Sequence, residues 1–258
     1  MVNSAERDRR LQPRRRPLWL AAGVLGLGVA VSGCVSTEQK SVWAHIQDAR
    51  IIASQSPLIV RRASREVRVT RVALLRTGGR LAIAVGLRNT TSYALNDLPI
   101  SVGVRAKGGA RIYLNRASGL DYFKTHVAEI PAGRTATWVF TAHRPRRLAG
   151  RPFAVAGNET LPRITVARSI PSIRAVLASA SAPAGKDAMR ITVTNLSSVP
   201  QSELPVYALA LSAGRYTAAG STTIADLGTG SSTTTSVGLV GRLSGARVSL
   251  EALPTLFH

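Results

Sequence analysis

Two halves of this chain repeat one spacing of turn and strand residues, and this repeat constrains the fold more than any other feature. Asn89 is followed nine residues later by the Leu-Pro pair that begins at Leu98, and Asn195 is followed at the same spacing by the pair that begins at Leu204. The offset between the copies is 106 residues here and 97 further on, so the first copy holds about nine extra residues near 117–125. A repeat of this length predicts two copies of one structural unit.

Apolar residues alternate with other residues ahead of each repeated asparagine, over 81–87 and again over 189–193. This period of two predicts half-buried strands. Each copy offers about seven short segments of this kind, separated by turn signals, and no convincing helix. The pattern predicts an all-β chain with two tandem immunoglobulin- or fibronectin-type β-sandwiches, at 66–165 (with the insertion near 117–125) and at 172–258.

Two strands give expectations about packing. Trp138 and Phe140 share one face of a strand, and we expect them in the core rather than on a carbohydrate-binding platform. Every residue of the segment 206–211 is apolar, so a strand formed by this segment has two apolar faces. A strand of this kind is expected to contact the neighbouring domain or a partner.

The second copy contains the runs Ile191–Ser198, Leu204–Val206 and Ile224–Ser231, and the first copy follows the same order. This succession of a strand ending in Asn, a further strand, and a Leu-x-x-Gly turn into a Ser/Thr-rich strand resembles bacterial CARDB and FxLYD-type modules. These modules are immunoglobulin-like. The resemblance implies adhesion, spacing or assembly at the cell surface, with no shared catalytic residues.

Residues 1–33 have the layout of a secretory signal peptide. Arginine pairs precede an apolar, glycine-rich run over 18–30, and Ser32 and Gly33 lead into Cys34, the only cysteine. The ending Val31–Cys34 resembles the lipobox of bacterial lipoproteins, which implies that Cys34 is lipidated and becomes the first mature residue. Two or more acyl chains anchor a protein stably. We therefore expect an extracytoplasmic, lipid-anchored protein of the cell envelope, on the outer face of the plasma membrane or on an outer membrane.

Other interpretations of the N-terminal region stay open. A transmembrane anchor would need about 20 apolar residues, more than this run provides. The segment Arg15–Leu18 loosely resembles a twin-arginine export signal, so export can follow either the general secretory or the twin-arginine route. Residues 34–65 are interpreted as a lipidated tether that partly docks on the first domain. The stretch that starts near Ser41 is either a short helix or, around Ile51 and Ile52, strand material.

The chain is strongly basic, with 34 Lys and Arg against 13 Asp and Glu and a net charge of +21. The leader holds six Arg, one Asp and one Glu, so the mature part carries +17. Either the charges are simply solvated, or they attract an anionic wall polymer or lipid headgroup. Nucleic acid is not an expected partner, because arginines and aromatic residues do not interleave as in a base-stacking surface.

No residue pattern predicts catalysis, a metal site or a cofactor. The four histidines lack metal-ligand spacing, and no second cysteine is present. The carboxylates form no close pair in the sequence, and no nucleophile elbow or phosphate-binding loop is found. The repeated asparagines are expected to bond to their own turns and to tolerate left-handed backbone.

The insertion and the strands before it are the best candidate for a ligand or partner surface, because function concentrates in loops held by a rigid scaffold. The alternative is a lid over the end of the sandwich. The candidate residues are Arg105, Lys107, Arg111, Tyr113, Arg116, Tyr122, Phe123, Lys124 and His126.

These observations predict a non-enzymatic envelope lipoprotein that acts as a surface binding, adhesion or scaffolding module. The alternative function is a sensor or solute-recognition subunit for an anionic envelope ligand, either a wall polymer or a lipid headgroup. The expected partners are the membrane, reached through Cys34, an anionic polymer or lipid, and other envelope proteins.

Overall fold

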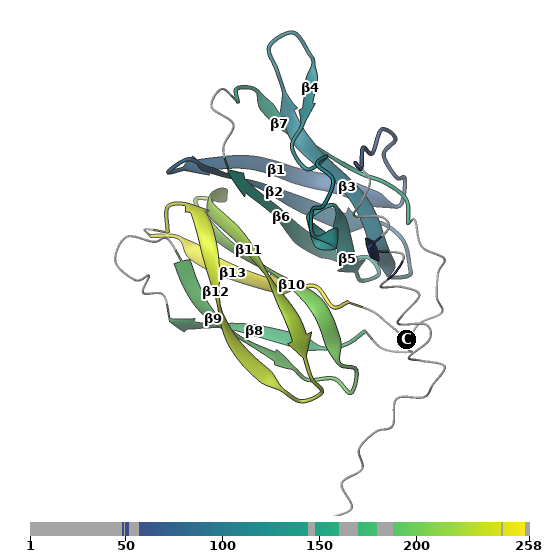
Figure 1. Ribbon diagram of the computed structural model, residues 1–258, viewed down its shortest axis with the longest axis vertical. Coiled ribbons are helices and arrows are strands. Elements are labelled where there is room, and N and C mark those ends of the chain that lie inside the picture. Colours follow the sequence, from purple (N-terminus) through teal and green to yellow (C-terminus); the bar gives the residue numbers. More distant parts are fainter. Residues whose placement is uncertain are drawn as a thin grey trace, which may run out of the picture. The chain divides into compact units, whose positions relative to one another are not determined.

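The computed structural model describes residues 48, 50, 51, 57–143, 148–159, 170–179, 188–243 and 245–255 (Figure 1). The signal sequence, Cys34 and most of the predicted tether lie outside these residues. The described part is all-β and forms antiparallel immunoglobulin-like β-sandwich sheets, which confirms the predicted fold class. The strands are β1 (Val67–Thr77), β2 (Arg80–Asn89), β3 (Leu95–Arg105), β4 (Arg111–Tyr113), β5 (His126–Ile130), β6 (Thr135–His143), β7 (Arg151–Ala156), β8 (Ile173–Ser179), β9 (Ala188–Asn195), β10 (Gln201–Ser212), β11 (Arg215–Leu227), β12 (Ser232–Gly241) and β13 (Arg247–Ala252), with one short 3-10 helix, η1 (Tyr122–Lys124).

The first half of the chain forms two sheets. One has the order β1-β2-β6, and the other is built around β3. The first part of β3 pairs with β5, and its last residues pair with β4 on one edge and with β7 on the other. Apolar side chains from both sheets, including Ile83, Val102 and Trp138, are completely buried between them. Trp138 and Phe140 are thus core residues, as predicted.

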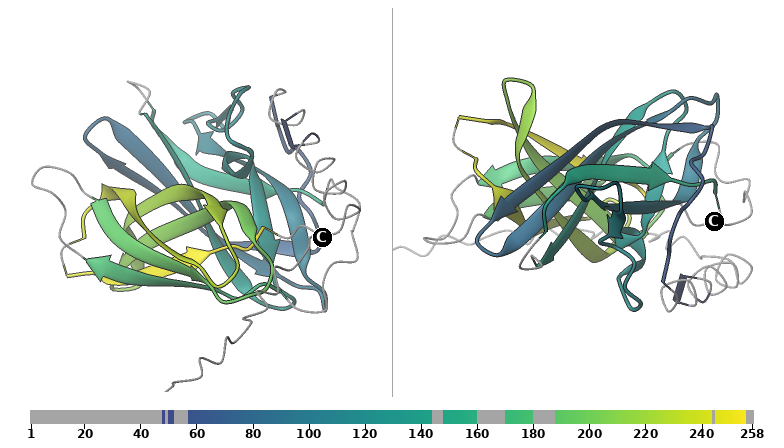
Figure 2. Two further views of the ribbon diagram at one scale, coloured as in Figure 1. Left: turned by 60° about the horizontal axis from the view of Figure 1, so that its bottom comes forward. Right: turned by 90° about the horizontal axis from the view of Figure 1, so that it is seen from above.

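The second half repeats the pairings of the first in one six-stranded sheet, β13-β10-β11-β12-β9-β8. Here β10 pairs with β11 and β13, just as β3 pairs with β5 and β7, and Figure 2 follows these strands from two further directions. The sequence predicts about seven short strands in each copy. Among the described residues the second half has six, because the continuous 13-residue β11 takes the place of β4 and β5. The insertion splits that strand in the first half.

The repeated asparagines make the same hydrogen bonds in both halves. The side-chain nitrogen of Asn89 donates to the carbonyls of Tyr93 and Ile130, and its oxygen accepts from the backbone and hydroxyl of Thr91. Asn195 makes the equivalent four bonds, with Val199, Leu227 and Ser197 as partners. The predicted bonding of each asparagine to its own turn is therefore confirmed.

The predicted left-handed backbone occurs at a different pair of repeated positions. Neither asparagine has a positive φ, whereas Asp97 and Glu203 have φ angles of 47° and 52°. Both lie early in equivalent strands, β3 and β10, each at a position where the ladder lacks one pair while the register on either side is unchanged.

Strand β10 is buried on both faces, as its sequence predicts. Val206, Ala208 and Ala210 belong to the core of the second half. On the opposite face, Tyr207 and Leu209 belong to the core cluster that also contains the first half's Trp138 and Phe140. The second apolar face of this strand therefore packs against the neighbouring half of the chain.

Candidate functional site

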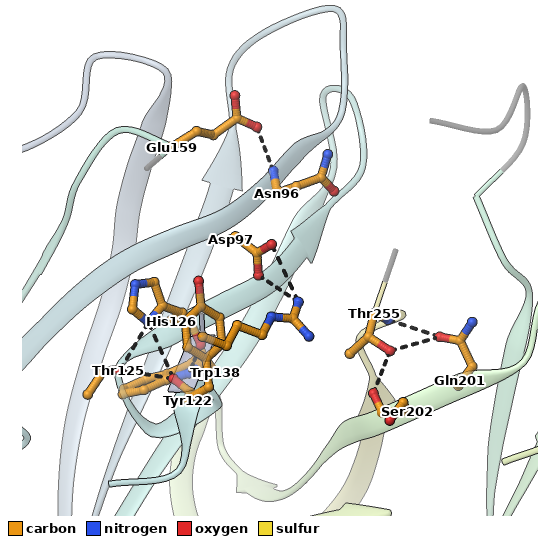
Figure 3. A network of polar contacts seen from close by, with 11 residues as sticks. Asn96, Asp97, Tyr122, Thr125, His126, Trp138, Glu159, Gln201, Ser202 and Thr255 are labelled. Atoms are coloured by element: carbon orange, nitrogen blue, oxygen red, sulfur yellow. Dashed lines mark hydrogen bonds and ion pairs between the residues drawn. The ribbon is translucent and has the colours of Figure 1, made fainter. Parts of the chain in front are cut away.

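The aromatic residues of the insertion lie inside the sandwich. Tyr122, Phe123 and His126 are 6%, 6% and 3% exposed. The rings of Tyr122 and His126, both labelled in Figure 3, stack in parallel with their centroids 4.0 Å apart. The indole nitrogen of Trp138 donates to the carbonyls of Phe123 and His126. These three aromatic candidates form a lid over the core, and their rings are not available as an exposed platform.

Asn115 fixes the insertion to the sheet, a role that the sequence analysis missed. Its side-chain oxygen accepts a hydrogen bond from the backbone of Val102, and its nitrogen donates to the carbonyls of Ile100 and Lys124. The Lys124 side chain is 39% exposed and pairs with Asp121 at 2.7 Å. The only sequence signal for this role was an asparagine between a strand and a turn-rich segment.

Arg50 contacts the insertion from the segment that precedes the first strand. It is 5% exposed, donates to both carboxylate oxygens of Asp97, and lies 4.9 Å and 4.8 Å from the ring centroids of Tyr122 and Phe123. Figure 3 labels Asp97, and dashed lines there mark the hydrogen bonds of its carboxylate. The end of the predicted tether is therefore held against the first half by a buried charge and two rings.

Burial shifts the pKa values of two titratable groups near this end of the sandwich. Burial lowers the pKa of His126 to about 4, so its imidazole is neutral at pH 7. Burial raises the pKa of Glu129 to about 8, and neither carboxylate oxygen of Glu129 has a hydrogen-bond partner in the described structure. Both groups are closed off from solvent, so they are placed for packing rather than for proton transfer to a ligand.

Four other candidates belong to the hairpin of β3 and β4, whose strands are labelled in Figure 1. Arg105 on β3 is directly opposite Arg111 on β4 and Arg151 on β7. Directly opposed residues of neighbouring strands project to the same face. All three arginines are exposed, whereas the adjacent Val104 is completely buried, so this arginine row (Arg111, Arg105 and Arg151) faces solvent. Lys107 is exposed in the hairpin between Arg105 and Arg111.

Two residue pairs inward along the strands, on the same face, two aromatic rings meet above a glycine. Gly103 is directly opposite Tyr113 and Phe153, whose rings pack edge to face with centroids 5.3 Å apart. A Cβ atom at Gly103 would clash with the carbonyl of Ile112 and lie 2.9 Å from the Phe153 ring. Glycine is therefore required for this aromatic pair (Tyr113 and Phe153), which is half-buried and lies beside the arginine row.

The structure thus brings together Arg105, Lys107, Arg111 and Tyr113, and leaves Arg116 exposed beyond β4. It adds Arg151 and Phe153, which the sequence analysis did not propose. Arg151 and Phe153 are two residues apart in β7, so their side chains lie on the same face of that strand. Only the pairing of β7 with β3 shows which face this is.

The arginine row lacks compensating acid. Within the described residues, none of its three arginines has a carboxylate or other hydrogen-bonding side chain as a partner. The guanidinium of Arg111 lies 5.5 Å from the centroid of the Phe153 ring. Like charges placed directly opposite one another destabilise a sheet. A cluster of like charges that costs stability and has no neutralising partner is typical of a functional surface.

Within the described ranges, no group of three or more His, Cys, Asp or Glu residues is arranged to hold a metal ion. None of the helical segments that the structure describes has the length and apolar character needed to cross a membrane.

Comparisons with known proteins assign the chain to no family. No protein-family model matches the chain, and no curated protein sequence matches it. Among solved structures, the chain is similar to the crystal structure of red sea bream transglutaminase, at 12% identity and a TM-score of 0.21. The match covers 73% of this chain but only 30% of the transglutaminase chain.

Proposed function

We propose that this chain is a lipid-anchored, non-enzymatic protein of the cell envelope that binds an anionic ligand through the outer face of its β4-β3-β7 sheet. The ligand is a phosphate-bearing envelope component. The lipid anchor is Cys34, and the sandwiches hold the binding face on the extracytoplasmic side.

The arginine row is the observation that carries this proposal. Three arginines occupy directly opposed positions on adjacent strands, about 4.8 Å apart at the backbone, and no acidic side chain among the described residues pairs with them. Guanidinium groups bind phosphate and carboxylate through paired hydrogen bonds. An anion that bridges the row would remove the repulsion among its members, so ligand binding and fold stability would reinforce each other.

A protein partner is the second candidate, and one strand edge favours it. Strand β8 ends the six-stranded sheet and exposes Val176 and Leu177, which are 39% and 43% accessible. An edge strand offers unpaired backbone groups to an extended segment of another protein. Binding of this kind would make the chain an adhesion or scaffolding module.

Charge reversal within the row tests the anionic ligand. Arg105→Glu puts a carboxylate between Arg111 and Arg151, so it preserves the fold and blocks the anion site. Arg174→Glu on β8 is the matched control, since this exposed arginine makes the same change in net charge away from the row. We expect Arg105→Glu to weaken binding of the full-length chain to isolated envelopes by about tenfold or more, and Arg174→Glu to change it little.

A salt series separates the two candidates. Anion binding falls steeply as ionic strength rises, whereas strand addition at β8 persists. Equal effects of the two charge reversals would overturn the arginine row as the binding site. Labelling with radioactive palmitate, compared between the wild-type chain and Cys34→Ser, tests the anchor: incorporation in both would contradict lipidation at Cys34.

A further inference from the structure

The binding face has two parts that lie side by side. The arginine row lies at Arg105 on β3, and the aromatic pair lies at Gly103, two residues earlier on the same face. Two residues of an extended strand span about 7 Å. A ligand that used both parts would carry a flat, weakly polar group and an anionic group within this distance.

The arginine row and the aromatic pair favour different chemical groups of a ligand. The guanidinium groups suit a phosphate, which they bind by charge-assisted hydrogen bonds. The half-exposed rings of Tyr113 and Phe153 suit the C–H-rich face of a sugar ring, which buries apolar area on an aromatic surface while its hydroxyl groups stay hydrated. A phosphate without an organic group would leave the aromatic pair unused.

Arg50 and the arginine row lie at opposite ends of one strand. Arg50 follows Cys34 by sixteen residues and is bound to Asp97, near the start of β3. Arg105 lies eight residues further along that strand, about 27 Å away. Arg50 is therefore held at one end of the strand, and the arginine row lies at the other.

We infer that this face binds the glycosyl phosphate units of an anionic envelope polymer, with phosphate on the arginine row and a sugar ring on the aromatic pair. This inference rests on the proposed function. It specifies the ligand as a phosphorylated glycan rather than a bilayer headgroup.

The test is a ligand-observed NMR titration of the full-length chain in detergent with three soluble probes. Glucose 1-phosphate carries both groups, inorganic phosphate lacks the ring, and glycerol 3-phosphate represents the headgroup backbone of a phospholipid. We expect glucose 1-phosphate to bind about three- to tenfold more tightly than either of the others. Tyr113→Ala should abolish this preference, whereas Tyr113→Phe, which keeps the ring, should preserve it.

The outcomes separate the inference from the proposed function. Equal binding of all three probes, sensitive to Arg105→Glu but not to Tyr113→Ala, would overturn the glycosyl phosphate and leave the anion site in place. Binding of glycerol 3-phosphate as tight as that of glucose 1-phosphate would favour headgroups and likewise overturn it. No binding of any probe, or binding unaffected by Arg105→Glu, would overturn both.

Discussion

Arg50 and Asp97 form a buried ion pair, with a guanidinium nitrogen 3.1 Å from a carboxylate oxygen. The two residues are 47 positions apart in the chain. Their side chains are only 6% and 10% exposed, and the guanidinium also lies against Tyr122 and Phe123. The segment before the first strand is therefore part of the folded unit.

Asp97→Asn should destabilise the fold by about 1.5–3 kcal/mol, because it removes the carboxylate charge that accepts hydrogen bonds from the buried Arg50 guanidinium. Asparagine tolerates the left-handed backbone at this position, where φ is 47°, so the substitution changes the charge and little else. Glu203→Gln is the matched control at the equivalent, exposed position, and should change the free energy of unfolding by about 0.5 kcal/mol or less. Urea denaturation measures both, and equal effects would contradict the role of the ion pair.

Glu129 should make stability fall with rising pH between about 4.5 and 8. Its folded pKa is raised to about 8 from 4.5, so the folded state keeps a proton that the unfolded chain releases in this window. The contribution is complete below pH 4.5, is lost as the pH rises through 8, and amounts to roughly 5 kcal/mol.

Glu129→Gln mimics the protonated side chain and should flatten this part of the pH profile. Glu251, whose pKa burial raises to about 7, titrates in the same window, so the difference between the wild-type and Glu129→Gln profiles isolates Glu129. Parallel profiles measured by denaturation from pH 4 to 9 would show that Glu129 ionises normally.

Asn89→Ala and Asn195→Ala should destabilise the protein by similar amounts, about 2–4 kcal/mol each. Each substitution removes the same four hydrogen bonds and leaves buried carbonyls without a donor. Asn158→Ala, at an exposed asparagine, is the control and should be nearly neutral. A large effect at only one of the two repeated positions would show that the copies do not share this anchor.

Leu209→Ala should cost about 2–5 kcal/mol, because it opens a cavity in the core that the two halves share. Leu209 is 1% exposed, whereas Leu196, the control for Leu→Ala, is 58% exposed. Thermal unfolding followed by circular dichroism should show a lower midpoint for Leu209→Ala alone. An unchanged midpoint would mean that this face of β10 contributes no packing energy.

The candidate surface shows where sequence reasoning stopped. Arg105 and Arg111 are close in the sequence and flank a glycine-containing turn, so their proximity in a hairpin could be expected. Arg151 lies 46 residues after Arg105 and reaches it only because β7 pairs with β3. Tyr122 and Phe123 looked like exposed loop residues, because composition does not show that Asn115 fixes the insertion over the open end of the core.

The sequence by itself determined the repeat, the strands and the asparagine turns, because these depend on residues close together in the chain and on a period of two that marks the buried face. It also determined that β10 would be covered on both sides. Only the tertiary structure decided which arginines stand in one row, which rings meet above Gly103, and which aromatic residues fill the core. Those relationships depend on the register between strands distant in the sequence and on what covers each sheet, and neither leaves a local pattern.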